Sequence, residues 1–229
     1  MRKALLIAAT LGAAWASPAP APIAPSVARA LRLPRRTSDP GGVAVTFDDG
    51  PHPQGTPAVM EALREAAAPA TFFLVGEHAV RNPSLAAEIV AAGHSVALHG
   101  HRHRNLLRLT AGQFAADLER GIAAISDSTG VQPTVYRPPY GIFSAAGVGI
   151  VRRRGLRSLL WSRWGHDWRG RNTAGAIAAE VSSGLGGGDV LLLHDADHYS
   201  APGSWKRTAA ALPRVLAAIE AAGLRPIAI

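Results

Sequence analysis

Two observations predict an α/β fold with a parallel sheet of about seven strands. First, short apolar runs alternate with helical stretches from Val43 to the end of the chain. Second, the polar residues best suited to chemistry come directly after these runs, as ligand-binding residues do in parallel sheets. About seven strands in roughly 190 residues favour a small or incomplete (β/α) barrel, and an open doubly wound sheet is the alternative.

The strands are predicted from runs rich in β-branched, aromatic and other apolar residues. These runs cover residues 43–47, 70–75, 95–98, 134–136, 156–161, 190–193 and 225–229. Helices are predicted between them, at residues 56–67, 82–93, 110–130, 144–154, 173–183 and 206–222. Thr56 and Pro57 supply an N-cap and a first-turn proline, Thr110 and Gln113 form a capping box, and Gly130 ends that helix.

Residues 1–16 are predicted to be a secretory signal peptide. Basic residues precede an apolar run at 4–15 that is too short for a comfortable membrane span, and Ala14-Trp15-Ala16 has the small-x-small form of a cleavage site. We therefore expect secretion to the extracellular space or the cell wall, with no stable membrane insertion after cleavage at Ala16. An uncleaved membrane anchor is the alternative.

Residues 17–40 are predicted to be a Pro-, Ala- and Arg-rich linker that is semi-rigid and largely disordered. Six prolines occur there without apolar periodicity. Residues 41–229 are then a single domain, which is long enough to bury one sizeable core.

The composition limits the kinds of site and partner. Without cysteine, any metal must be held by His, Asp or Glu. The formal charge of +8 becomes +6 when Arg2 and Lys3 leave with the signal peptide (8 − 2 = 6). Arginine clusters could favour an anionic wall polymer or membrane surface, or could simply be solvated. No basic motif interleaved with aromatic residues indicates nucleic acid, and no feature indicates an oligomer, so a monomer is expected.

Asp48 and Asp49 end the first predicted strand at a Gly-Pro turn. Where a strand gives way to a loop, neighbouring side chains no longer alternate strictly, so both carboxylates can point into one cleft. One could bind a cation while the other moves a proton. A solvated turn is the alternative for this motif taken alone.

His99 and His103 follow the third predicted strand, four residues apart. A helical turn or tight loop would bring both to one cation, and with Asp49 they form a two-His-one-carboxylate set that leaves room for water. An extended backbone would instead place His101 on the same face, so His101 stays open as a ligand. A solvated basic loop is the alternative.

Further polar residues follow the later strands. Arg137 precedes two prolines that fix the backbone, so it could pair with a carboxylate, and the amide of Tyr140 could point at an oxyanion. Asp167 and Trp168 lie in a tryptophan-rich loop, where core packing explains one or two of the tryptophans. His194 ends a buried strand as a general acid would, with a structural histidine as the alternative.

Five segments carry these residues in order. They are T-F-D-D-G-P at 46–51, H-x-x-x-H at 99–103, R-P-P-Y-G at 137–141, D-W at 167–168 and L-x-H at 192–194. Together they resemble the motifs of the polysaccharide deacetylases with a NodB homology domain, carbohydrate esterase family 4, over roughly residues 41–229. The resemblance implies that the fold is a distorted, incomplete (β/α) barrel. It also implies that the protein removes N- or O-acetyl groups from sugar polymers. It also implies a divalent metal, usually Zn²⁺, with Co²⁺, Ni²⁺ or Mn²⁺ as alternatives.

The resemblance also implies a role for each matching residue. Asp49, His99 and His103 would be the metal ligands. Asp48 would be the catalytic base, held and tuned by Arg137.

The remaining roles concern the leaving group and the acetyl pocket. The amide of Tyr140 would help to form the oxyanion hole, and Asp167 would orient His194, the general acid. Trp168 and Leu192 would wall the acetyl pocket.

Substrate access is less constrained by these motifs. Family members commonly carry Ser or Thr directly after the first metal histidine, where this chain has Gly100, and the lost hydroxyl would alter support of the ligand or substrate contacts. Trp164, Tyr199 and Trp205 are candidates for sugar stacking, with core packing as the alternative. Residues 195–206 are expected to form a loop at the mouth of the site.

The expected function is a secreted metal-dependent hydrolase that removes N-acetyl groups from GlcNAc-containing polysaccharide, either peptidoglycan or chitin oligomers. An O-acetyl esterase of the xylan type is the first alternative, because it shares every motif. A non-catalytic carbohydrate-binding module is the second, and the presence of Asp48 and His194 argues against it.

Overall fold

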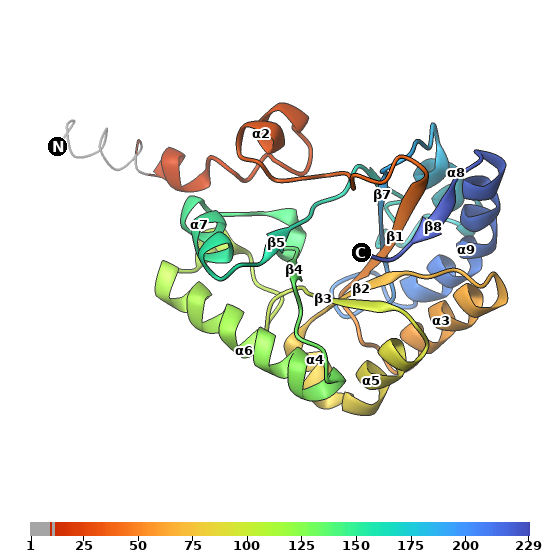
Figure 1. The fold of residues 1–229 in the computed structure, drawn as a ribbon, viewed down its shortest axis with the longest axis horizontal. Coiled ribbons are helices and arrows are strands. Elements are labelled where there is room, and N and C mark those ends of the chain that lie inside the picture. Colours follow the sequence, from red (N-terminus) through yellow and green to blue (C-terminus); the bar gives the residue numbers. More distant parts are fainter. Residues whose placement is uncertain (1–9, 11) are drawn as a thin grey trace.

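The computed structural model describes residue 10 and residues 12–229, so most of the predicted signal peptide, residues 1–9 and 11, lies outside the described residues (Figure 1). In the described part of the chain, eight strands form one sheet with parallel neighbours. They are β1 (Gly42–Asp48), β2 (Thr71–Leu74), β3 (Ser95–Leu98), β4 (Val135–Tyr136), β5 (Arg157–Ser158), β6 (Arg163–Trp164), β7 (Val190–His194) and β8 (Arg225–Ile227). Their order is β5-β4-β3-β2-β1-β7-β6, with β8 paired to β1.

Strand β1 is the centre of the sheet and is buried along its whole length. It pairs with β7 on one edge, while β8 and β2 share the other edge, β8 beside residues 42–44 and β2 beside residues 46–48. The sheet is therefore seven strand positions wide. Because β5 and β6 end the strand order and do not pair in the described residues, the prediction of a distorted, incomplete (β/α) barrel is confirmed.

Helices connect the strands and form an arc outside them from α6 to α9 (Figure 1). They are α2 (Pro25–Ala30), α3 (Gly55–Glu65), α4 (Gly76–Arg81), α5 (Pro83–Ala91), α6 (Ala111–Thr129), α7 (Ala145–Arg153), α8 (Ala174–Ser182) and α9 (Ser204–Ala221), with 3₁₀ turns at Leu106–Arg108 and Pro139–Gly141. The capping box of α6 is confirmed by hydrogen bonds in both directions between Thr110 and Gln113, and Gly130 ends that helix with a φ of 72°. No helix among the described residues is both long and apolar enough to span a bilayer.

The strand prediction differs from the structure after β4. The run predicted at 156–161 contains only the two residues of β5, and β6 was not predicted. The carbonyls of Leu159 and Leu160 accept hydrogen bonds from the Arg137 side chain, at 3.1 and 3.2 Å, instead of from a neighbouring strand. A buried arginine thus supplies the partners of these two carbonyls, while the N–H of Leu159 still donates to Tyr136 of β4.

The prediction of a largely disordered linker at 17–40 is wrong. This segment contains α2, and three of its apolar side chains, Ala21, Ala28 and Leu33, are at most 2% exposed in the main core. Pro25 starts the helix, where its missing N–H and fixed φ are tolerated, so one proline in the segment initiates structure.

The end of the same segment lies at the opening of the barrel. The carbonyl of Pro34 accepts a hydrogen bond from the N–H of Leu160 at 2.9 Å, and the side chain of Arg35 donates to the carbonyl of Trp161 at 2.9 Å. Arg36 forms an antiparallel bridge with Asp189, directly before β7. Residues 34–36 therefore lie between the two ends of the sheet.

Candidate active site

The carboxyl edge of the sheet carries the predicted site residues. Strand register places Asp48 of β1 beside His194 of β7. The pairing of β3 with β4 brings His99 and Arg137, the next residue after each strand, to the same edge. A cavity of about 290 Å³ lies there. Its lining comprises Asp48, Asp49, His99, His103, Tyr140, Gly141, Trp161, Trp164, Trp168, Leu192, His194, Tyr199 and Ser200.

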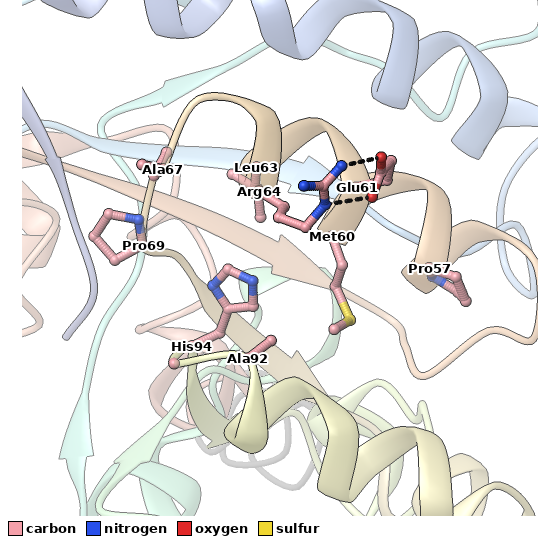
Figure 2. Close-up of a pocket in the computed structure, with 11 residues that line it drawn as sticks. Pro57, Met60, Glu61, Leu63, Arg64, Ala67, Pro69, Ala92 and His94 are labelled. Carbon is pink, nitrogen blue, oxygen red and sulfur yellow. Dashed lines mark hydrogen bonds and ion pairs between the residues drawn. The ribbon is translucent and has the colours of Figure 1, made fainter.

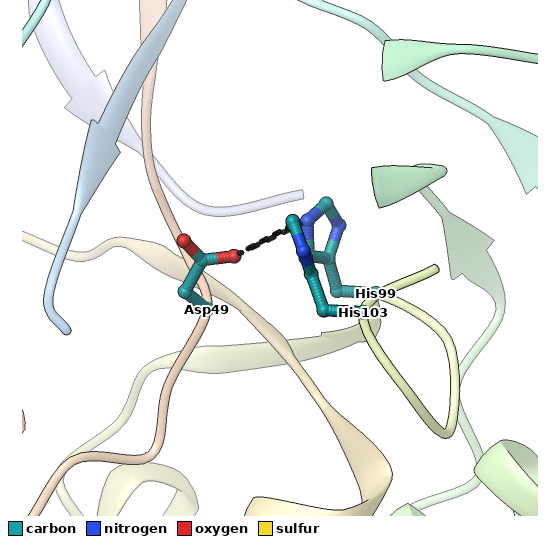
Figure 3. A group of neighbouring side chains, drawn as sticks. All are labelled: Asp49, His99 and His103. Carbon is teal, nitrogen blue, oxygen red and sulfur yellow. Dashed lines mark ion pairs between the residues drawn. The ribbon is translucent and has the colours of Figure 1, made fainter. Parts of the chain in front are cut away.

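Asp49, His99 and His103 form a group whose three ligand atoms lie within 4.8 Å of one another (Figure 3). The Nε2 atoms of His99 and His103 lie 3.5 and 3.4 Å from the same oxygen, Oδ1 of Asp49. That oxygen is buried and has no hydrogen-bond partner among the described residues. Two imidazole nitrogens facing an unpaired carboxylate oxygen are a donor set that fits Zn²⁺ and similar divalent ions. These residues can therefore hold a metal.

Both histidines of this group are neutral. Burial, together with the charge of Arg137, lowers the pKa of His99 to about 3. Burial likewise lowers the pKa of His103 to about 2. The Nδ1 atom of His99 lies 2.9 Å from the carbonyl of Arg137, and donation to this acceptor leaves the lone pair of Nε2 facing Asp49. Burial raises the pKa of Asp49 itself to about 7.

Asp48 forms a buried ion pair with Arg137. The Nη1 atom of Arg137 donates to Oδ1 of Asp48 at 2.6 Å and to Oγ1 of Thr46 at 2.9 Å. Burial raises the pKa of Asp48, and the charge of Arg137 opposes this effect. The second oxygen, Oδ2, lies 3.8 Å from Nε2 of His99. Asp48 thus presents one oxygen to the arginine and the other to the metal group.

Arg137 is fully buried and held on several sides. Its Nε and Nη2 atoms donate to the carbonyls of Leu159 and Leu160, and its guanidinium carbon lies 3.8 Å from the ring centre of Phe73. Because all three nitrogens of the guanidinium donate hydrogen bonds, the arginine can hold Asp48 in one orientation.

His194 is held by Asp167. The Nδ1 atom of His194 lies 2.9 Å from Oδ1 of Asp167, and its backbone N–H donates to Oδ2 at 2.7 Å. Thr208 of α9 donates to the same Oδ2 at 2.8 Å. Burial lowers the pKa of His194, but the charge and hydrogen bond of Asp167 outweigh it and raise the pKa to about 10. Its Nε2 is 4.0 Å from Asp49 and is therefore a proton donor next to the metal group.

The cavity walls include the other predicted residues. Trp168 packs against His194 at 5.5 Å between ring centres, and Leu192 reaches the cavity from β7. Tyr140 has a φ of 61°, which is uncommon for a residue with a side chain, and its ring packs against His103 at 4.5 Å. The role of the Tyr140 amide stays a prediction.

His101 does not join the metal group in the described residues. Its N–H donates to Asp117 at 3.0 Å, and its side chain lies beside Gly76, where an added Cβ would come within 2.8 Å of Nδ1. The neighbouring Gly100 has a φ of 89°. Serine or threonine would be strained in this backbone conformation, so glycine here is matched to the loop.

Sequence reasoning missed three residues that support the site. Thr46 lies two residues before Asp48 on the same face of β1, a spacing that could have indicated it. Thr208 lies far away in sequence, on a helix, and no local pattern identifies it. Asp195 directly follows His194 and is fully buried, with a hydrogen bond from Thr56 and a pKa that burial raises to about 7.

Asp195 also explains the glycine of the first motif. A Cβ added at Gly50 would overlap the carboxylate of Asp195, so only glycine fits between β1 and this side chain. Of the three residues predicted for sugar stacking, Trp164 and Tyr199 line the cavity. Trp205 does not line it and packs near His52, at 5.9 Å between ring centres.

A second cavity, of about 610 Å³, lies at the opposite edge of the sheet (Figure 2). It is formed by α3 and by the segments that lead into β2 and β3, including Met60, Pro69 and His94. Its charged groups, Glu61 and Arg64, pair with each other. It contains none of the predicted site residues.

Comparison with known proteins agrees with this geometry. A family model described as polysaccharide deacetylase matches residues 35–159. The chain is 33% identical over 181 residues to a peptidoglycan-N-acetylglucosamine deacetylase from Listeria monocytogenes, with 79% of this chain aligned but only 36% of the Listeria protein. It is also 33% identical over 202 residues to a chitooligosaccharide deacetylase from Azorhizobium caulinodans, covering 84% of this chain and 96% of that protein.

A solved structure is similar over nearly the same region. The family 4 carbohydrate esterase from Streptomyces lividans, in complex with acetate, has a TM-score of 0.74 and 34% identity, covering 82% of this chain and 93% of that chain. The chain therefore belongs to the polysaccharide deacetylase family, carbohydrate esterase family 4.

Proposed function

We propose that this protein is a secreted, metal-dependent hydrolase that removes N-acetyl groups from GlcNAc-containing polysaccharide, either peptidoglycan or chitin oligomers, and that it acts as a monomer. One observation carries the proposal. A carboxylate paired with an arginine and an imidazole paired with a carboxylate both border the same cavity, next to a His-His-Asp group. Family relatives named for peptidoglycan and chitooligosaccharide support the substrate class.

The metal would be held by Asp49, His99 and His103, with Zn²⁺ the preferred ion and Co²⁺, Ni²⁺ or Mn²⁺ as alternatives. When bound, such an ion activates water and polarises a carbonyl oxygen. The neutral histidines and the unpaired oxygen of Asp49 support this assignment.

Asp48 acts as the base. It borders the cavity and its pKa is raised by burial, so it can accept a proton from the water that attacks the acetyl carbon. Arg137 fixes the carboxylate through Oδ1 and leaves Oδ2 for the water. The proton moves to Asp48 as the new carbon-oxygen bond forms.

His194 acts as the acid. Its Nε2 carries a proton at neutral pH because Asp167 raises the pKa, and this proton goes to the sugar nitrogen as the carbon-nitrogen bond breaks. Acetate and a free amino sugar result. The amide of Tyr140 is proposed to donate to the carbonyl oxygen as that oxygen gains charge, while Trp168 and Leu192 enclose the acetyl methyl group.

Export is part of the proposal. The basic start, the apolar run and the small-x-small site at Ala14-Trp15-Ala16 support a signal peptide at residues 1–16. An exported enzyme would meet peptidoglycan or chitin outside the cytoplasm.

The test is acetate release by the protein that begins at Ser17, loaded with Zn²⁺ and supplied in parallel with chitin oligomers, peptidoglycan and acetylated xylan. We expect release from one of the two GlcNAc polymers and loss of that release in chelator-treated protein. Release from xylan alone would indicate the O-acetyl esterase. Polymer binding without any release, at full metal occupancy, would indicate the binding module.

A further inference from the structure

The two histidines of the metal group are held in different ways. His99 has a carbonyl partner for Nδ1, the oxygen of Arg137 at 2.9 Å. The Nδ1 atom of His103 is buried and has no hydrogen-bond partner among the described residues. Metal-binding histidines almost always use the second ring nitrogen in a hydrogen bond that fixes the ring. Something else must therefore orient His103.

Aromatic rings enclose the imidazole of His103. Tyr199 stacks on it face to face, at 4.0 Å between ring centres and 13° between ring planes. Tyr140 meets it edge-on, at 4.5 Å and 63°. Because a stacked ring prevents the imidazole from tilting toward it, Tyr199 restricts the ring in the direction that a hydrogen bond would otherwise control.

Tyr199 is itself anchored away from the metal group. Its hydroxyl lies 2.9 Å from Nε2 of His78 and donates to Oε1 of Glu77 at 3.4 Å, so two residues of α4 hold the end of the ring. His78 in turn stacks on His198, at 3.9 Å and 16°. The tyrosine thus links α4 to His103.

The loop that carries Tyr199 is tied down on both sides of the tyrosine. Asp197 lies 3.1 Å from Nε2 of His52 and accepts a hydrogen bond from the N–H of Gly203 at 2.6 Å. The N–H of Ala201 donates to the carbonyl of Trp168 at 3.1 Å. A loop with these bonds can keep the tyrosine ring in one place.

We propose that Tyr199 is a positioning residue for the metal site, whose ring face takes the place of the missing hydrogen bond to His103. This inference rests on the proposed metal site at Asp49, His99 and His103. It differs from the role of sugar stacking, because the face of Tyr199 that lies on His103 is not available to a sugar.

The experiment compares Tyr199→Leu, which removes the ring, with Tyr199→Phe, which keeps the ring and removes the hydroxyl. Zn²⁺ affinity is measured by calorimetric competition against a chelator. Tyr199→Leu is expected to bind Zn²⁺ about 3- to 10-fold more weakly, which is the size of effect an aromatic pair produces. Tyr199→Phe is expected to stay within about 2-fold of the unsubstituted protein, because stacking depends on the ring.

A second measurement does not require metal. The imidazole nitrogen and carbon resonances of His103 in metal-free protein report its ring orientation, and they should broaden or shift in Tyr199→Leu and not in Tyr199→Phe. Trp205→Leu is the control for damage to the loop, since Trp205, the second residue of α9, packs near His52, the partner of Asp197, and does not line the cavity. It should leave Zn²⁺ affinity and the His103 resonances unchanged.

The outcomes separate this inference from the proposed function. If Tyr199→Leu only raises KM for the polymer, with Zn²⁺ affinity and the His103 resonances unchanged, Tyr199 contacts sugar and the inference is overturned. Equal losses in Tyr199→Leu and Trp205→Leu would indicate general loop damage and also overturn it. If the unsubstituted protein binds no Zn²⁺, the proposed metal site fails, whatever Tyr199 does.

Discussion

Asp48 and Asp49 are sequence neighbours with different surroundings. Asp48 is bound to a buried arginine, whereas Oδ1 of Asp49 faces two neutral histidines and has no hydrogen-bond partner in the described residues. A carboxylate held by an arginine, such as Asp48, can accept and release a proton while it stays in position. A carboxylate oxygen that faces two neutral histidines, such as that of Asp49, is suited to bind a cation together with them. In the proposed mechanism the two residues therefore divide the roles of base and metal ligand between them.

Removing either proton-transfer group is expected to lower turnover without removing the metal. Asp48→Asn and His194→Ala should each reduce the rate of acetate release at least ~100-fold, the usual contribution of a general base or acid. Metal content is measured in the same samples. Asp127→Asn, at an exposed position of α6, is the matched control and should retain full activity. Near-normal turnover in either variant, with metal bound, would remove that residue from its role.

At the scale of residues, the sequence predicted which side chains lie together at the carboxyl edge of the sheet. It did not predict the contacts that orient them. Asp48, Asp49, His99 and His103 follow strands, and parallel strands deliver such residues to one edge. From spacing alone His101 stayed open as a ligand. Its exclusion depends on the contact with Gly76 and on the bond to Asp117 from α6, which no local pattern encodes.

At the scale of elements, the segment before β1 packs against the domain that was predicted to begin at residue 41. Leu33 is 2% exposed within the main core, and Pro22 approaches Gly141, which lines the cavity, so that a Cβ there would lie 2.8 Å from its ring. Residues 17–36 therefore pack as part of the folded unit. Their Pro22 also lies against a residue of the cavity that holds the proposed catalytic groups.

This packing predicts a stability loss that a disordered linker would not give. Leu33→Ala should lower the free energy of unfolding by about 2–5 kcal/mol, because it removes a buried side chain and leaves a cavity. Ile23→Ala, in the same segment but 70% exposed, should change it by less than about 0.5 kcal/mol. Urea unfolding followed by circular dichroism measures both. Equal stability of the two variants would indicate that the segment is a linker that does not pack on the core.

The helices and strands could be predicted where residues adjacent in sequence determine them. The capping box of α6 and the apolar runs of β1, β3 and β7 depend on neighbouring residues, and the structure contains them. The early end of β5 coincides with the bonds of Arg137, whose guanidinium donates to the carbonyls of Leu159 and Leu160, and no local pattern indicates this contact. The packing of residues 17–36 depends on apolar side chains too far apart to show a period.

At the scale of the whole molecule, the proposed metal would join distant parts of the chain. Asp49 follows β1, whereas His99 and His103 follow β3, 50 and 54 residues later (99 − 49 = 50; 103 − 49 = 54). Thr208 of α9, still farther along the chain, donates a hydrogen bond to Asp167, the partner of the proposed acid His194. An unfolded chain does not hold these ligands together, so the metal should bind the folded state far more tightly and stabilise it.

The expected result is a rise in Tm when Zn²⁺ is added to metal-free protein. At free Zn²⁺ about 100 times the Kd, linkage stabilises the fold by about 2.7 kcal/mol, which corresponds to roughly 5–10 °C for a chain of this size. Asp49→Asn is the matched variant, because it keeps the shape of the side chain and replaces the charged ligand by an amide. Its Tm should rise much less at the same Zn²⁺ concentration, as measured by circular dichroism. An equal rise in both proteins would mean that Zn²⁺ stabilises the fold from somewhere other than Asp49, His99 and His103.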